Sequence, residues 1–183
     1  MGRLRVESCA IGFSGQIGSG KTTVSQTVSQ ALQWPRASFG DFVRSVAISR
    51  GVAVESREIL QEIGASLISK GWPEFCRDVL TAVGWERGSS IVVDGIRHAE
   101  AVQHLSEIVA PLPFILVHVN IDEQARNVRL LRRDGAAAQV EVESHSTEAA
   151  VKTVLPEIAN LSVTATQPID QIMAEIIAYL ERR

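Results

Sequence analysis

The stretch Gly15-Gln16-Ile17-Gly18-Ser19-Gly20-Lys21-Thr22 decides the fold of this 183-residue chain. It follows an apolar run at positions 9–13 and leads into residues 23–28, whose pattern predicts a helix. A strand, a glycine-rich loop with the spacing G-x-x-x-x-G-K-T and a helix form the context of a Walker A loop. Glycines let backbone N–H groups turn toward an anion, and the positive end of the new helix points at the same anion. The stretch therefore predicts a binding site for a nucleoside triphosphate.

Individual residues of this loop have expected roles in binding ATP. Lys21 would reach the β- and γ-phosphates, and the Thr22 hydroxyl would bind Mg²⁺. The alternative, a glycine-rich turn with an incidental lysine, is disfavoured because the flanking strand and helix patterns also fit. The residues expected to bind ATP are Gly15, Gln16, Ile17, Gly18, Ser19, Gly20, Lys21, Thr22 and Thr23.

Length and composition indicate one folded domain over positions 1–183, with 45% hydrophobic residues to build its core. A formal net charge of −3 gives no reason to expect a nucleic acid as partner. Two cysteines are too few for a disulfide scaffold or a Cys₄ zinc site. No stretch approaches the roughly 20 apolar residues that a membrane span requires, so we expect a cytoplasmic protein without a membrane partner.

Predicted strands and helices alternate along the rest of the chain. Strands are expected at 37–39, 89–95, 114–121 and 163–165, and helices at 21–32, 40–51, 56–70, 73–85, 98–108, 122–134, 146–160 and 169–180. Alternation of this kind predicts an α/β fold, a three-layer α/β/α sandwich with a parallel sheet and the P-loop NTPase fold. Ligands bind such sheets at the carboxyl ends of the strands, so one site could collect the loop, Asp41 and Asp94.

Asp94 ends the apolar run at 89–95, where an acid could hold Mg²⁺ directly or through water. A helix N-cap or a turn residue is the alternative for this position. Gly95 would permit the backbone to approach a ligand closely, and Arg97 could place a bidentate guanidinium on a phosphate. The expected metal-binding residues are therefore Thr22 and Asp94.

Asp41 and Arg44 lie three residues apart near the start of a predicted helix and share one face of it. The acid could orient an acceptor or a metal-bound water, while the arginine holds the acceptor's charged group. An N-cap aspartate with a local ion pair is the alternative. The residues expected to bind the acceptor are Asp41, Arg44, Gly95 and Arg97.

Four arginines crowd one short predicted helix, at Arg126, Arg129, Arg132 and Arg133. Cations so close repel one another mildly, and a site with several phosphates would explain them. An ordinary solvated face is the alternative. The polar stretch that follows would suit a short lid, at about 126–145, which closes over the triphosphate and excludes water.

With these residues in view, the chain resembles small P-loop kinases of the nucleoside monophosphate kinase group over nearly its whole length. Gly40-Asp41-Phe42-Val43-Arg44 is similar to their acceptor-binding segment, and Asp94-Gly95-Ile96-Arg97 resembles the D-G-x-x-R strand end of adenylate kinases. Residues 57–64 and 145–148 are similar to segments of deoxynucleoside monophosphate kinases, and dephospho-coenzyme A kinase has the same plan. The chain departs from adenylate kinases in having Ile96 in place of the usual proline, and in lacking a cysteine-bearing lid.

The resemblance implies that the γ-phosphoryl group of ATP is transferred, with Mg²⁺, to a small phosphorylated acceptor such as a (deoxy)nucleoside monophosphate. Acceptor-binding helices would occupy about 40–87, and Lys21, Asp41, Arg129 and Arg133 would be the catalytic residues. Dephospho-coenzyme A or another small molecule is the alternative acceptor. A phosphate that is already ionised at neutral pH needs no general base, whereas a hydroxyl acceptor would give Asp41 that task.

A function of another class stays open: an ATP-hydrolysing switch or assembly factor that acts through a protein partner. The clustered arginines would then form an interaction face, and ATP hydrolysis would not depend on an acceptor. Two features favour the kinase: the pair of Asp41 and Arg44 on the acceptor side, and the clustered arginines of the predicted lid. The expected partner is a small-molecule nucleotide acceptor, with no nucleic acid and no membrane, and the chain is expected to be a monomer or homodimer.

Overall fold

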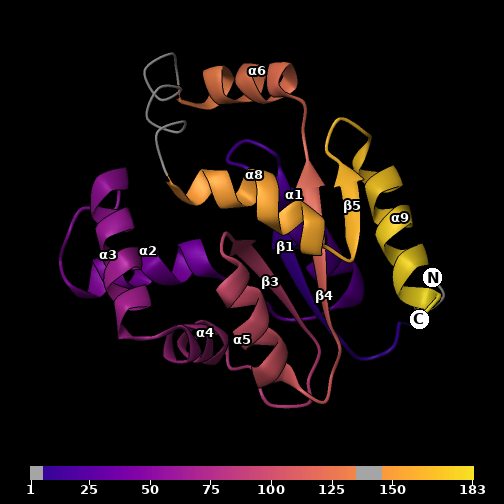
Figure 1. Cartoon of the computed structure of the whole chain (residues 1–183), viewed down its shortest axis with the longest axis horizontal. Coiled ribbons are helices and arrows are strands. Elements are labelled where there is room, and N and C mark those ends of the chain that lie inside the picture. The colour runs from indigo at the N-terminus through magenta and orange to yellow at the C-terminus, as the bar shows by residue number, and fades with distance from the viewer. Residues whose placement is uncertain (1–5, 135–145) are drawn as a thin grey trace.

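A parallel β-sheet runs through the centre of the molecule (Figure 1). The structure, a computed structural model, describes residues 6–134 and 146–183. Within these ranges the sheet has five strands in the order β2-β3-β1-β4-β5, and all neighbouring strands are parallel. The strands are β1 Ala10–Ser14, β2 Arg36–Ser38, β3 Ile91–Ile96, β4 Phe114–Asn120 and β5 Leu161–Thr164. This order places β1, and the Walker loop that follows it, between β3 and β4.

Helices cover both faces of this sheet, as Figure 1 shows. The described helices are α1 Lys21–Leu32, α2 Phe39–Ser49, α3 Arg57–Lys70, α4 Trp72–Thr81, α5 Ala99–Val109, α6 Glu123–Asp134, α8 Ser146–Ile158 and α9 Ile169–Glu181. In the described ranges, none of them combines the length and apolar character that crossing a bilayer requires.

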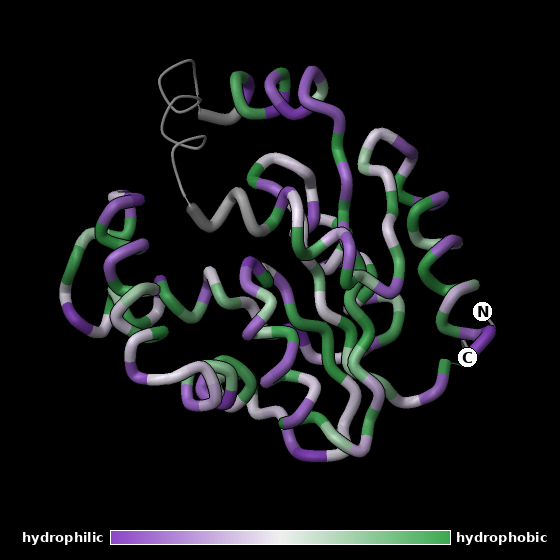
Figure 2. The backbone as a smooth tube through the Cα atoms, in the orientation of Figure 1, coloured by the Kyte–Doolittle hydropathy of each residue, from purple (hydrophilic) through white to green (hydrophobic). Residues whose placement is uncertain are grey.

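Side chains alternate between the two faces along each strand and so separate two hydrophobic clusters. In β3, Ile91 and Val93 belong to a cluster with residues of α2, α3, α4, α5 and α8, whereas Val92 belongs to a cluster with residues of α1 and α9. Figure 2 shows hydrophobic residues along the central strands. Since both faces of these strands are covered, their sequences read as continuous apolar runs. The predicted three-layer α/β/α sandwich is confirmed.

The start of α2 differs from the sequence prediction, which began this helix at Gly40. Ser38 is the N-cap, and its side-chain oxygen accepts a hydrogen bond from the Asp41 backbone N–H at 3.2 Å. The helix therefore begins at Phe39, and the strand before it runs over Arg36–Ser38 rather than 37–39. The interpretation of Asp41 as an N-cap is wrong, because Asp41 lies in the first turn and a serine three residues earlier caps the helix.

Candidate active site

The Walker loop joins the buried strand β1 to α1, and its backbone leaves the first turn of that helix uncapped. Gly15, Gly18 and Gly20 have φ angles of 148°, 86° and 86°, and the Ser19 N–H donates to the Gln16 carbonyl at 3.0 Å. Gly20 is the N-cap of α1, with no side-chain cap hydrogen bond in the described chain. The N–H groups of the first helical turn, which Lys21 begins, therefore point out of α1 as an anion site requires.

A Gly20→Ala substitution tests this loop geometry. An alanine at φ 86° is strained by about 1–2 kcal/mol, and its Cβ would lie 3.1 Å from Arg129 Nη1. Because the loop N–H groups must shift to relieve this, we expect AMPPNP to bind about tenfold more weakly. Isothermal titration calorimetry measures the affinity.

Gly84→Ala is the matched control, since Gly84 also has a positive φ, of 68°, but its Cβ would meet no atom within 4 Å. It should lose a similar free energy of unfolding and keep its nucleotide affinity. Equal nucleotide affinities of the two variants would contradict a role for the Gly20 backbone in binding.

Asp94 lies near the carboxyl end of β3, opposite Phe13 of β1, and is only 2% exposed. Its Oδ2 accepts a hydrogen bond from Arg36 Nη2 at 2.5 Å. Its Oδ1 is buried and has no hydrogen-bond partner among the described residues. A buried carboxylate oxygen without a partner is costly, and a bound cation or its water would satisfy it.

Arg36 contacts two of the predicted site residues and was not itself predicted from the sequence. Its Nε donates to Ser25 Oγ at 3.1 Å, its Nη1 to Asp41 Oδ2 at 3.3 Å and its Nη2 to Asp94 Oδ2. The side chain is 15% exposed, so these partners stabilise a largely desolvated cation. No motif indicates such a residue, because the contacts depend on which strand lies next to β2.

The two predicted acceptor residues of α2 do lie together. Arg44 Nη1 donates to Asp41 Oδ1 at 3.1 Å, and the two side chains are 54% and 61% exposed. Each Asp41 oxygen thus accepts a hydrogen bond from a different arginine. Gly95, with a φ of 84°, faces the start of α2, since a Cβ there would lie 3.7 Å from the Gly40 nitrogen. A Cβ at Gly95 would thus be in ordinary van der Waals contact with the start of α2. Arg97 follows directly after β3.

Helix α6 lies against the Walker loop through two of its arginines. Arg126 is 2% exposed and donates from Nε to the Ile17 carbonyl at 3.1 Å. Arg129 donates from Nη1 to the Ser19 carbonyl at 3.0 Å and from Nη2 to the Ala165 carbonyl at 2.7 Å. The alternative of a purely solvated arginine face is wrong for Arg126. Arg132 is exposed, while the Arg133 side chain and residues 135–145 of the predicted lid lie outside the described parts of the chain.

The residues around the loop fit a magnesium ion that is bound mainly by phosphates and water. The described residues contain no group of three or more His, Cys, Asp or Glu side chains that could hold a metal alone. Mg²⁺ commonly takes one or two protein oxygens together with phosphate and water ligands. The Thr22 hydroxyl and the unpartnered Asp94 Oδ1 could supply such oxygens.

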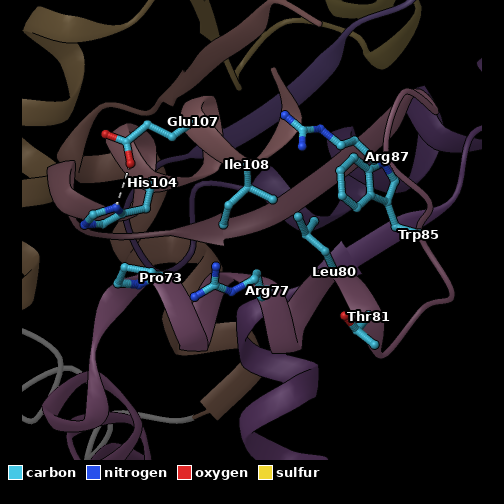
Figure 3. Close-up of a pocket in the computed structure, with 9 residues that line it drawn as sticks. All are labelled: Pro73, Arg77, Leu80, Thr81, Trp85, Arg87, His104, Glu107 and Ile108. Atoms are coloured by element: carbon cyan, nitrogen blue, oxygen red, sulfur yellow. Dashed lines mark hydrogen bonds and ion pairs between the residues drawn. The ribbon is translucent and has the colours of Figure 1, made fainter. Parts of the chain in front are cut away.

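Among the hollows on the surface of the described chain, two differ in their relation to this site. The larger, of about 470 Å³, lies between α4 and α5 and is lined by Arg77, Trp85 and the His104–Glu107 pair, among others (Figure 3). None of the predicted site residues lines it. The smaller, of about 270 Å³, is lined by Arg36, Ser38, Asp41, Phe42, Ser45, Val79, Ala82 and Val83. We associate the smaller hollow with the site because Arg36 and Asp41 form its polar side.

Beneath the Walker loop, Ser14 and His118 form a buried pair between β1 and β4. The Ser14 Oγ and His118 Nδ1 atoms are 2.9 Å apart, and both side chains are at most 2% exposed. Burial lowers the pKa of His118 below its ordinary value of 6.5. As the pH falls, the unfolded chain therefore takes up a proton at this histidine before the folded chain does.

We expect this histidine to make the protein less stable in mild acid. The free energy of unfolding should fall as the pH drops below 6.5, by at most about 1.4 kcal/mol per pH unit for one proton. His118→Asn, which keeps a polar group near Ser14, should show a shallower slope in denaturant unfolding. Some slope should remain, because burial also lowers the pKa of His98. Identical slopes in the two proteins would contradict the assignment.

Comparisons with known proteins agree with this fold. A UPF0200 protein of Pyrobaculum aerophilum is 28% identical over 123 residues, which span 67% of this chain and 65% of that relative. A candidate kinase of Chloroflexus aurantiacus has a TM-score of 0.62 at 22% identity, covering 97% of this chain and 98% of the other. The APS kinase of Mycobacterium tuberculosis, solved with AMPPNP and APS, has a TM-score of 0.60 at 18% identity, covering 95% and 98%.

These likenesses show a kinase-like P-loop fold. The AAA_18 family, described as an AAA domain, matches residues 11–150, which include the Walker loop, Asp41, Asp94 and the arginines of α6. The chain therefore belongs to the AAA_18 family.

Proposed function

We propose that this protein transfers the γ-phosphoryl group of ATP to a small phosphorylated acceptor, of which a (deoxy)nucleoside monophosphate fits best. One observation carries the proposal. Arg36 links Asp94, near the strand end beside the Walker loop, to Asp41, which pairs with Arg44 on the acceptor side. The Arg36 side chain thus spans the distance between the proposed ATP site and the charged pair Asp41–Arg44. Phosphoryl transfer requires the donor and the acceptor to be bound this close together.

On the donor side, the uncapped first turn of α1 and the loop N–H groups hold the phosphates. Lys21 adds a positive charge near the group in transfer, where negative charge spreads over the equatorial oxygens. Mg²⁺, when bound, neutralises charge on the β- and γ-phosphates. Thr22 and Asp94 are the protein groups that would hold it, directly or through water.

On the acceptor side, the hollow of about 270 Å³ offers a polar wall and an apolar wall formed by Phe42, Val79 and Val83. Asp41 positions groups here rather than removing a proton, because both of its oxygens already accept hydrogen bonds from arginines. This favours an acceptor phosphate, which needs no general base. Arg44 and Arg97 bind that phosphate.

We propose the following division of the chain into functional segments. The chain is one kinase domain, in which the helices within about 40–87 hold the acceptor and a short lid over about 126–145 closes on ATP. Arg129 already holds the Ser19 and Ala165 carbonyls. It therefore contacts a phosphate only by giving up one of these bonds, and Arg133 supplies a second cation from the same helix.

The test is ADP release from Mg²⁺–ATP with a panel of acceptors. The panel contains each ribo- and deoxyribonucleoside monophosphate, dephospho-coenzyme A and an acceptor-free control. A rate that rises with one nucleoside monophosphate supports the proposal, and a rise with dephospho-coenzyme A alone names a different kinase. A rate that is the same with every acceptor contradicts a kinase and favours the ATP-hydrolysing switch.

A further inference from the structure

Arg36 lies on β2 and joins three other elements of the fold. Its three guanidinium nitrogens donate to α1 at Ser25, to α2 at Asp41 and to β3 at Asp94. Ser25 in turn donates to the Thr22 carbonyl at 2.9 Å, which connects the guanidinium to the Walker helix. The Arg36 side chain therefore contacts Asp94, the proposed magnesium ligand, and Asp41, the proposed acceptor-binding residue. It also contacts Ser25, which is hydrogen-bonded to the first turn of α1.

The burial of this cluster is uneven. The Asp94 side chain is 3% exposed, whereas that of Asp41 is 61% exposed. A charge pair as buried as Arg36–Asp94 holds its geometry tightly, since separating it would leave two desolvated charges. Asp41, at the other end of the guanidinium, is open to solvent and can respond to a ligand. The arrangement is a buried acid and a solvent-exposed acid joined by one rigid, planar group, so a displacement of one acid is passed to the other.

We infer that Arg36 is a positioning residue that couples the two halves of the site, so that binding of the metal–nucleotide at Asp94 strengthens binding of the acceptor at Asp41. The inference rests on the function proposed above. A shift of Asp94 toward a metal-bound water would turn the guanidinium, and Asp41 would follow because its Oδ2 is bound to the same group. A lysine at position 36 would keep the charge, but it could not hold three partners in one plane.

The competing explanation is purely structural: Arg36 would only neutralise the buried Asp94. In that case Arg36→Lys, which keeps the charge, should retain the stability and the function of the unmodified protein. Under our inference, Arg36→Lys should remain folded and lose the coupling. The two explanations therefore differ in a binding measurement and not only in activity.

The experiment measures the affinity of each nucleoside monophosphate by calorimetry, with and without saturating Mg²⁺–AMPPNP. In the unmodified protein we expect Mg²⁺–AMPPNP to tighten acceptor binding by about fivefold or more, which is the usual lower range of coupling between sites. In Arg36→Lys the acceptor affinities with and without Mg²⁺–AMPPNP should become equal within about twofold. Arg50→Lys, the same exchange at an exposed position at the end of α2, should keep the coupling of the unmodified protein.

A second variant keeps the test valid if Arg36→Lys does not fold. Asp41→Asn changes only the exposed end of the bridge, and it should also abolish the coupling. Coupling that is unchanged in either folded variant, or that is absent from the unmodified protein although the acceptor binds, overturns the inference. Failure of the proposed function has a different signature: ADP release from the unmodified protein does not depend on any acceptor.

Discussion

Replacing Lys21 with alanine is expected to lower the rate of phosphoryl transfer by at least about a hundredfold, as is typical when a main contact to the transition state is lost. Lys21 is the first residue of α1, directly after the left-handed N-cap Gly20. Its ammonium group is the cation that the Walker loop sequence at 15–22 itself supplies. ADP release at saturating acceptor, with the acceptor named by the panel, measures the effect.

Lys70→Ala is the matched control for this prediction. Lys70 is an exposed residue at the end of α3, so its loss should change the rate by less than about twofold. Circular dichroism and denaturant unfolding establish that both variants are folded. A folded Lys21→Ala protein with near-normal turnover would exclude the loop as the site of transfer.

The sequence was sufficient to predict the layers of the fold because local patterns determine them. Continuous apolar runs predicted buried parallel strands, and the run at 89–95 corresponds to β3 at Ile91–Ile96. The boundary at α2 was harder to predict, since Ser38 and Asp41 are both good N-terminal residues for a helix. Their order in the first turn depends on a single hydrogen bond, from the Asp41 N–H to Ser38 Oγ.

The candidate site could be predicted only in part. The sequence pattern of a helix or strand shows which residues share a face, but it does not show which other element packs against that face. The arginines of α6 were correctly placed on one helix, yet Arg126 and Arg129 contact carbonyls of the Walker loop itself. Arg36 was missed for the same reason. Its contact with Asp94 arises from the pairing of β2 with β3, which are 58 residues apart at these positions. Chain order does not specify that pairing.

Asp94→Asn is the second substitution expected to have a large effect. The amide keeps the volume of the side chain but removes the charge that a metal or its water requires. We expect Mn²⁺, used as a probe in the AMPPNP complex, to bind about 10–100-fold more weakly by electron paramagnetic resonance. Turnover should fall by a factor on the order of a hundred.

The free energy of unfolding of the Asp94→Asn protein must be measured together with its metal affinity and turnover. The substitution also removes the buried negative charge that pairs with the Arg36 cation. Breaking a buried pair costs roughly 3 kcal/mol or more. Arg36 also contacts Asp41 and Ser25, so the loss should lie at the low end of that range. Asp78→Asn, at an exposed position of α4, is the control and should change neither metal affinity nor stability. A folded Asp94→Asn protein that binds Mn²⁺ normally would mean that Asp94 serves only to hold Arg36, and the metal would then depend on Thr22 and the phosphates alone.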